Sequence, residues 1–450
     1  MAANTAANSG TKCLPLVPAQ SEPRDRREAV GEMPEKPYEW ADGATLQEHS
    51  KRKLKILREY FSRYLAVRCQ LPQQELFRLA VVDGFAGGGR YRCGTPGSPL
   101  IFVDELKTFV VAENVRRADQ GMKALRIECQ LILNDAKAAV VEMLKGTLAP
   151  LIGDIKETAP QLQIKVVYLS EPFETAFPKI KDFLDHGRLR NVVFNLDQCG
   201  HSHVERTTLI DILRSYRGAE IFCTFSIEAL VTYLRKAEPE AFTAQLAHIG
   251  LSDKDLRSLE GAMSNQAWLG AAERVVFGAF KDCAPYVSPF SIHNPDGWRY
   301  WLIHFANSYR GRQEYNNVLH RNATLQAHFG RSGLEMLAYD PRHEVGALYL
   351  FDDLARASAK DQLMDDVPRL LSEFGDALSV GNFYEAIYNN TPAHMDDIHA
   401  AIIENADLEV ITEEGGERRK AGTIVIGDTI RLRKQRSFFP AFSSSSKKRK

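Results

Sequence analysis

The chain has 450 residues, of which 44% are hydrophobic, and its 57 Lys and Arg almost balance its 58 Asp and Glu. One hydrophobic core stops growing well below this length, so we expect two or three domains, and the balanced charge excludes an argument for nucleic-acid binding from bulk charge alone. The seven cysteines form no Cys-x-x-Cys pair, and neither a signal-peptide pattern nor a membrane-length apolar run is present. We therefore expect a reduced, cytoplasmic protein that has no contact with a membrane.

The two ends of the chain differ in composition from the rest. Residues 1–40 are rich in Ala, Asn, Ser and Pro and show little apolar periodicity, which predicts a disordered segment. Residues 437–450 end in Lys-Lys-Arg-Lys and are predicted to be a basic disordered tail, which would add electrostatic attraction to phosphates.

Between these ends, the first part of the chain alternates between short apolar runs and helical periodicity. Apolar residues recur every three or four positions from Ala44 to about Arg68, which predicts an amphipathic helix. Five predicted strands follow, separated by predicted helices: 78–82, 129–135, 164–169, 191–197 and 219–226. A strand pair after the fifth, containing Trp298–Phe305, would complete the sheet. This order predicts an α/β domain over residues 41–345, with a doubly wound, Rossmann-like parallel sheet.

A glycine-rich turn follows the first predicted strand. The stretch Leu79–Tyr91 reads Leu-Ala-Val-Val-Asp-Gly-Phe-Ala-Gly-Gly-Gly-Arg-Tyr, so a buried strand ends in Asp83 and breaks into glycines. Glycines let backbone N–H groups approach a ligand without a Cβ in the way. The spacing fits neither the dinucleotide fingerprint nor a P-loop. The other interpretation is a tight strand-to-loop turn with no ligand.

Four predicted strands end in an acid, at Asp83, Asp135, Glu171 and Asp197. Carboxyl ends of parallel strands meet at one edge of a sheet, where open α/β sheets bind their ligands. An acid after the second strand is placed to accept ribose hydroxyls, one after the third to meet an adenine amine, and one after the fourth to meet the substrate. Each acid taken singly could instead cap a helix.

Three segments in order resemble the three-Cys-motif partner family (TcmP), whose own domain is similar to class I S-adenosylmethionine-dependent methyltransferases. They are a lysine-containing helix at Lys55–Tyr60, the Asp-Gly-Phe-Ala-Gly turn, and Gly94-Thr-Pro-Gly-Ser-Pro-Leu100. The resemblance implies S-adenosyl-L-methionine as cofactor and a radical-SAM-like three-Cys-motif protein as partner. It implies that the turn residues and the second-strand acid hold the cofactor: Asp83, Gly84, Phe85, Gly87, Gly89, Arg90 and Asp135.

The loop after the fourth strand departs from that family. Members have a segment such as Asp-Pro-Phe-Gly there, whereas this chain has Asp197-Gln-Cys-Gly-His201. We predict that Asp197, with Gln198 or His201, orients the substrate. The spacing Cys199-x-His201-x-His203 would also suit zinc, but the sequence offers no obvious fourth ligand, so we expect no metal.

The pattern of predicted helices and strands changes at about Gly346. Predicted helices near 362–374, 380–388 and 393–405 precede strands at Leu408–Ile411 and Thr429–Arg433, an order that predicts a winged helix over residues 346–436. Thr391 is the expected N-cap of the third helix, with Pro392 in its first turn. That helix would be the recognition helix, and Arg418, Arg419 and Lys420 would contact nucleic acid from the wing. Its Met-Asp-Asp start is acidic, which favours a protein partner instead.

These features together predict methyl transfer from S-adenosyl-L-methionine, with nucleic acid as the substrate. Two alternatives stay open: a non-catalytic nucleic-acid- or protein-binding partner that retains the fold, and a nucleotide-processing enzyme built on the same sheet.

Overall fold

The computed structural model describes residues 40, 43–198, 204–226, 274–275, 277–294, 297–338 and 348–434. All of them belong to one compact unit, Pro37–Lys450. The predicted disordered segment before residue 40 and the predicted basic tail lie outside the described residues.

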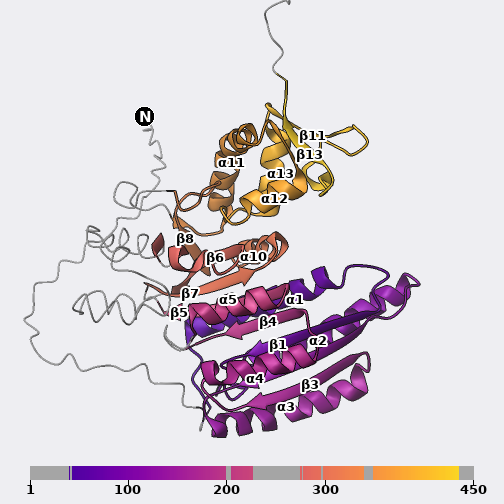
Figure 1. Ribbon diagram of the computed structural model, residues 1–450, viewed down its shortest axis with the longest axis vertical. Helices are drawn as coiled ribbons and strands as arrows, with labels where there is room; N and C mark the ends of the chain where they lie inside the picture. Colours follow the sequence, from indigo (N-terminus) through magenta and orange to yellow (C-terminus); the bar gives the residue numbers. More distant parts are fainter. Residues whose placement is uncertain are drawn as a thin grey trace, which may run out of the picture. The chain divides into compact units, whose positions relative to one another are not determined.

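The α/β domain is a mixed structure around a large, mostly parallel sheet (Figure 1). Five parallel strands form its first part, in the order β3-β2-β1-β4-β5. They are β1 (Leu76–Asp83), β2 (Arg126–Asn134), β3 (Leu162–Leu169), β4 (Asn191–Leu196) and β5 (Gly218–Ser226). All five predicted strands are confirmed, each within three residues of its expected bounds.

Helices cover both faces of this sheet (Figure 1). One face packs against α1 (Glu48–Arg68), α2 (Ser98–Asp119) and α3 (Ala138–Thr158), and the other packs against α4 (Phe173–His186) and α5 (Arg206–Ser215). Alternate residues of β1 explain this: Leu79 and Val81 join the first core, and Ala80 and Val82 join the second. A strand buried on both faces needs a continuous apolar run, and β1 supplies one up to Asp83.

The sheet continues beyond β5 with antiparallel strands in the order β7-β6-β8-β9. The predicted strand pair is confirmed as β6 (Tyr286–Asn294) and β7 (Gly297–Ala306), and β7 pairs with β5. The strands β8 (Gln326–Phe329) and β9 (Leu348–Tyr349) were not predicted. They span four and two residues, too few for a period-two pattern to show.

The C-terminal part is a winged helix, as predicted. Its sheet has the antiparallel order β10-β13-β11-β12, and three helices pack against it. In chain order the elements are α11 (Asp353–Glu373), β10 (Ala377–Ser379), α12 (Val380–Ile387), α13 (Met395–Glu404), β11 (Leu408–Ile411), β12 (Glu417–Arg418), the short 3₁₀ helix η2 (Ala421–Thr423) and β13 (Thr429–Leu432).

The predicted cap of the third helix is wrong. Helix α13 begins at Met395 and its N-cap is His394, whose Nδ1 accepts a hydrogen bond from the Asp396 N–H. The Thr391 hydroxyl instead closes a turn by accepting from the Ala393 N–H. The carbonyl of Thr391 accepts hydrogen bonds from another helix, so this residue fixes the approach to α13 and does not start it.

That other helix is α10 (Tyr309–Arg321), which carries buried polar side chains between the large sheet and the winged helix. The Arg312 guanidinium donates to the Val287 carbonyl in β6 at 3.2 Å and to the Thr391 carbonyl at 3.3 Å. The Asn316 amide also donates to Thr391, and Gln313 donates to the Tyr388 hydroxyl. Buried polar groups that are hydrogen-bonded fix a specific geometry, so these contacts set how the winged helix attaches to β6.

Candidate functional site

The glycine turn joins the carboxyl ends of three neighbouring strands. The Gly84 N–H donates to the Asn195 carbonyl in β4 at 3.0 Å, and the Ala86 N–H donates to the Asn134 carbonyl in β2 at 2.8 Å. The register places Asp83 beside Leu133 on one side and Asn195 on the other. The acids that follow β1, β2, β3 and β4 therefore lie at one edge of the sheet, as the strand pattern predicted.

The glycines of the turn have identifiable physical roles. Gly87 and Gly89 have φ of +63° and +90°, a region that favours glycine. A Cβ built on Gly84 would lie 2.8 Å from the Phe173 ring, and one on Gly87 would lie 2.4 Å from Trp40 Cζ2. The backbone of the turn is thus covered closely by aromatic side chains, and the Trp40 indole lies directly against Gly87. Phe85 is half-buried, with its ring centroid 5.7 Å from that of Phe173.

Asp83 is the most perturbed acid at this edge. Its side chain is fully buried, and burial raises the pKa of its carboxyl to about 7, although nearby Ser98 and Asn195 and the Phe85 N–H oppose the shift. Oδ1 accepts from the Phe85 N–H at 3.3 Å, whereas no donor in the described structure is aligned on Oδ2. A buried carboxyl with a raised pKa and an unsatisfied oxygen is typical of a functional site.

Asp135 lies across the turn from Asp83. Its Oδ2 accepts from the Gly87 N–H at 3.2 Å, and its Oδ1 accepts from the Lys137 N–H at 3.0 Å. Burial raises the pKa of Asp135, and these two hydrogen bonds oppose the rise. Both carboxylate oxygens keep lone pairs for further donors. The predicted ribose acid is therefore in direct contact with the predicted cofactor turn.

Glu171 joins the same edge through a residue that the sequence reasoning missed. The Asn134 side chain donates to the carbonyls of Gly84 and Glu171, at 3.1 and 2.9 Å, and accepts from the Glu171 N–H. It ties the glycine turn to the segment after β3. Glu171 Oε1 pairs with Lys179, and its Oε2 is buried with no donor among the described residues.

Asp197 forms a partly buried ion pair with Lys53 of α1. Burial alone would raise the pKa of Asp197, but the charge and hydrogen bond of Lys53, with help from Thr224, hold it below its usual value. A small cavity lies between α1 and the sheet here, and its lining includes Lys53, Asn195, Asp197 and Thr224. At the same edge the His49 ring stacks on Tyr300 with centroids 4.2 Å apart.

Lys53 was missed because the family resemblance pointed to the segment beginning at Lys55, which is exposed. The signal that could have identified Lys53 is its place on the buried face of α1. It lies four residues before Leu57 and seven before Tyr60, both of which are buried.

The other predicted substrate-facing residues are placed differently. The buried Gln198 amide lies 3.7 Å from Cys223 Sγ, so it faces the protein interior. His201 lies outside the described residues, as do Cys199 and His203. Arg90 is exposed beside the glycine turn, and its guanidinium donates to the Gly94 carbonyl at 3.0 Å.

The wing does not present the predicted trio of cations. Arg418 forms a bidentate ion pair with buried Asp428, at 2.9 and 3.2 Å, so its charge is used inside the module. The Arg419 side chain is 85% exposed, and Lys420 is also exposed. Of the three predicted nucleic-acid contacts, two are therefore exposed to solvent.

The predicted recognition helix, α13, is packed against neighbouring helices and is mostly shielded from solvent. In α13 only Asp396 and Glu404 are exposed, and both are acidic. A bidentate ion pair between Arg356 of α11 and Asp397 and a hydrogen bond between Tyr384 and His399 hold the helix against its neighbours. Residues 348–434 contain nine Lys and Arg and seventeen Asp and Glu. The acidic exposed residues of α13 disfavour contact with phosphates, and a groove-reading role for this helix stays a prediction.

Residues 338–415 match the family described as the GMT-like wHTH domain. The match covers β9 and the winged helix up to the loop before β12, and the other strands of the large sheet lie outside it. No curated protein matches this chain. Within the described part of the chain, every helix is too short or too polar to cross a membrane.

Proposed function

We propose that the α/β domain binds S-adenosyl-L-methionine and transfers its methyl group to nucleic acid, as a three-Cys-motif partner protein with a class I methyltransferase-like fold. The observation that carries the proposal is the contact between Asp135 and the glycine turn beside Asp83. Two acids from neighbouring strands and the backbone of the glycine turn meet there, with the Trp40 indole against Gly87. The strand pair after β5 is a further support, since the resemblance implies a sheet completed in this way.

The residues present suit an adenosyl ligand. Gly87 to Gly89 would lie under its methionine part with the Trp40 indole displaced from Gly87, and Asp135 would accept the ribose hydroxyls. Glu171 would meet the adenine amine with its unsatisfied Oε2, and Asp83 Oδ2 would accept a further donor of the ligand. Phe85 and Arg90 would border the bound molecule. When bound, the sulfonium supplies a methyl group that is already activated for attack.

The chain's own residues then have a modest task, which is alignment of the attacking group and acceptance of a proton. Lys53 keeps Asp197 ionised, so Asp197 accepts a hydrogen bond from the attacking amine or hydroxyl and orients it. His201, in the adjoining segment, is proposed as the second substrate-facing group. Gln198 faces Cys223 instead, so it is not proposed to contact the substrate.

Isothermal titration calorimetry with S-adenosyl-L-methionine tests the cofactor part. We expect saturable binding to the wild-type chain and its loss in Asp135→Ala, with Asp154→Ala, an exposed acid on α3, as the matched control. Transfer of a tritiated methyl group to single-stranded or duplex nucleic acid tests the reaction. Absence of binding to the wild-type chain would overturn the proposal.

The second candidate is a non-catalytic binding partner that retains this fold. Two observations favour it: Asp197 is already paired with Lys53, and Gln198 faces Cys223. This candidate predicts that S-adenosyl-L-methionine binds but no labelled methyl group is transferred. It also predicts that the chain co-purifies with a three-Cys-motif protein when the two are co-expressed. A cytoplasmic location stays a prediction from the cysteine pattern.

A further inference from the structure

A small hairpin projects from the glycine turn. Arg90 and Pro96 form an antiparallel bridge, the Tyr91 N–H donates to the Thr95 carbonyl at 3.0 Å, and the Gly94 N–H donates to the Tyr91 carbonyl at 2.8 Å. The Gly97 N–H then donates to the Gly89 carbonyl at 2.7 Å and closes the base of the hairpin on the turn. Hairpin 90–96 is therefore a defined structure held next to the predicted cofactor residues.

This hairpin carries cations and an aromatic ring. Arg90 and Arg92 are exposed, and Tyr91 between them is half-buried. The ring centroid of Tyr91 lies 5.3 Å from that of the half-buried Trp40, which also covers Gly87. Residues 84–103 contain no acid.

Cations beside aromatic rings form the usual surface for single-stranded nucleic acid. The cations contact the phosphates, and the bases stack on the rings without a strong sequence preference. The winged helix offers the opposite surface, because the exposed residues of α13 are acidic and Arg418 is paired with Asp428. The hairpin therefore attracts a phosphate backbone, whereas the winged helix does not.

We propose that hairpin 90–96, with Trp40, holds a single strand of nucleic acid beside the glycine turn, and that the winged helix does not. Arg90 and Arg92 contact phosphates, while Tyr91 and Trp40 stack on bases. The inference deepens the proposed function, since it names the surface that would bring the substrate to the cofactor edge.

Fluorescence anisotropy with a labelled single-stranded DNA of about 20 nucleotides, a length that exceeds the ~4–16-nucleotide sites usual for such surfaces, tests this. We expect Arg90→Gln with Arg92→Gln to weaken binding about tenfold or more and to reduce the salt slope by roughly 1.4, because about 0.7 is lost per phosphate contact on a single strand. Tyr91→Ala should weaken binding about tenfold through lost stacking.

The matched control removes two exposed cations from the wing, Arg419→Gln with Lys420→Gln, and should bind within about twofold of the wild type, since these cations lie on an acidic module. Equal losses in the two double variants, tighter binding of the duplex than of the single strand, or no binding by the wild-type chain would overturn the inference. Calorimetry with S-adenosyl-L-methionine on the single variant Arg92→Gln, which leaves Arg90 in place, keeps the two proposals separate. Cofactor binding that survives while DNA binding is lost supports both, and DNA binding without cofactor binding leaves the hairpin inference standing alone.

Discussion

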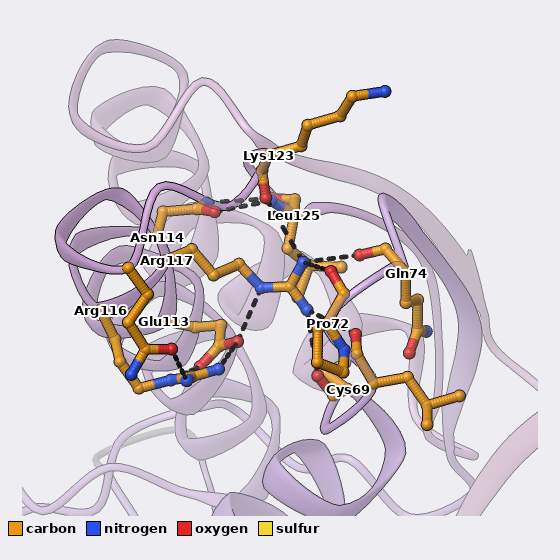
Figure 2. A network of polar contacts seen from close by, with 11 residues as sticks. Cys69, Pro72, Gln74, Glu113, Asn114, Arg116, Arg117, Lys123 and Leu125 are labelled. Carbon is orange, nitrogen blue, oxygen red and sulfur yellow. Dashed lines mark hydrogen bonds and ion pairs between the residues drawn. The ribbon is translucent and has the colours of Figure 1, made fainter.

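The two edges of the parallel strands differ in how fully their buried charged side chains are hydrogen-bonded. At the amino edge, Arg117 of α2 is fully buried and donates to the Gln74 carbonyl at 2.7 Å, to the carbonyls of Cys69 and Leu71 at 3.2 Å, and to Glu113 at 2.7 Å (Figure 2). At the carboxyl edge, Asp83 is equally buried but has an oxygen without an aligned donor and a raised pKa.

This difference separates stability from binding. Arg117 ties the loop between α1 and β1 to α2, with Asn114 beside it exchanging two hydrogen bonds with Leu125 (Figure 2). A fully satisfied buried charge fixes a loop, whereas an incompletely satisfied one destabilises the folded chain and keeps bonding capacity for a ligand. The following predictions test that contrast.

The largest expected effect is at the amino edge. Arg117→Leu leaves several buried backbone carbonyls without their donor, while Glu113 keeps Arg116, so we expect the free energy of unfolding to fall by about 4 kcal/mol. Arg116→Leu is the matched control, because Arg116 is exposed and pairs with the same Glu113, and should cost less than about 1 kcal/mol. Urea unfolding measures both, and equal losses would contradict the role given to Arg117.

A smaller effect is expected for Asp83→Asn, and it depends on pH. The folded-state pKa of Asp83 is raised to about 7, so the folded chain binds this proton more tightly than the unfolded chain. Its contribution to stability is present at low pH and is lost as the pH rises from about 4 to about 7.

Asp83→Asn removes that dependence, so the variant should gain roughly 3 kcal/mol relative to the wild type between pH 4.5 and pH 8. Urea unfolding at the two pH values measures the difference. Asp104→Asn, a half-buried acid on α2, is the control and should show no such change. A pH-independent difference for Asp83→Asn would contradict the raised pKa.

Lys53→Met should cost about 2 kcal/mol, because it leaves Asp197 at the carboxyl edge without its cation. The value is at the low end for a buried pair since the Asp197 side chain is 29% exposed. Lys55→Met, on the exposed face of the same helix, is the control and should change stability by less than about 0.5 kcal/mol. A loss in Lys55→Met equal to that in Lys53→Met would contradict the stabilising role given to the ion pair between Lys53 and Asp197.

The smallest effect is expected on the wing. Arg419→Ala should leave the free energy of unfolding within about 0.5 kcal/mol of the wild type, because its side chain is exposed and its nearest acid, on Glu417, lies 3.9 Å away. Arg418→Ala should cost about 1 to 2 kcal/mol, since Asp428 would be left buried without its partner. Thermal unfolding compares the two variants.

The sequence predicted what depends on local pattern. The run Leu79 to Asp83 and the glycines after it specify a buried strand and a turn within a few residues, and both were found where expected. The shared edge of the four acids followed from the parallel strands alone. Helix α3 continues to Thr158 because Leu148 and Ile155 extend its buried face.

What could not be predicted depends on contacts between distant segments. Lys53 and Asp197 are 144 residues apart, and only the packing of α1 on the sheet brings them together. The displaced start of α13 has the same cause, because α10 takes up the Thr391 carbonyl. The burial of α13 against α11 also depends on packing between distant segments. The acidic start of the helix was only an indirect sign of it.

Urea unfolding of the wild-type chain with and without S-adenosyl-L-methionine tests most directly whether the carboxyl edge is incomplete because it serves a ligand. At a concentration 100 times the dissociation constant, a ligand that binds the folded state alone adds about 2.7 kcal/mol to the free energy of unfolding. We predict a gain of this size in the wild type and in Arg116→Leu, and its absence in Asp135→Ala. No gain in the wild type, or an equal gain in Asp135→Ala, would contradict a ligand site at this edge.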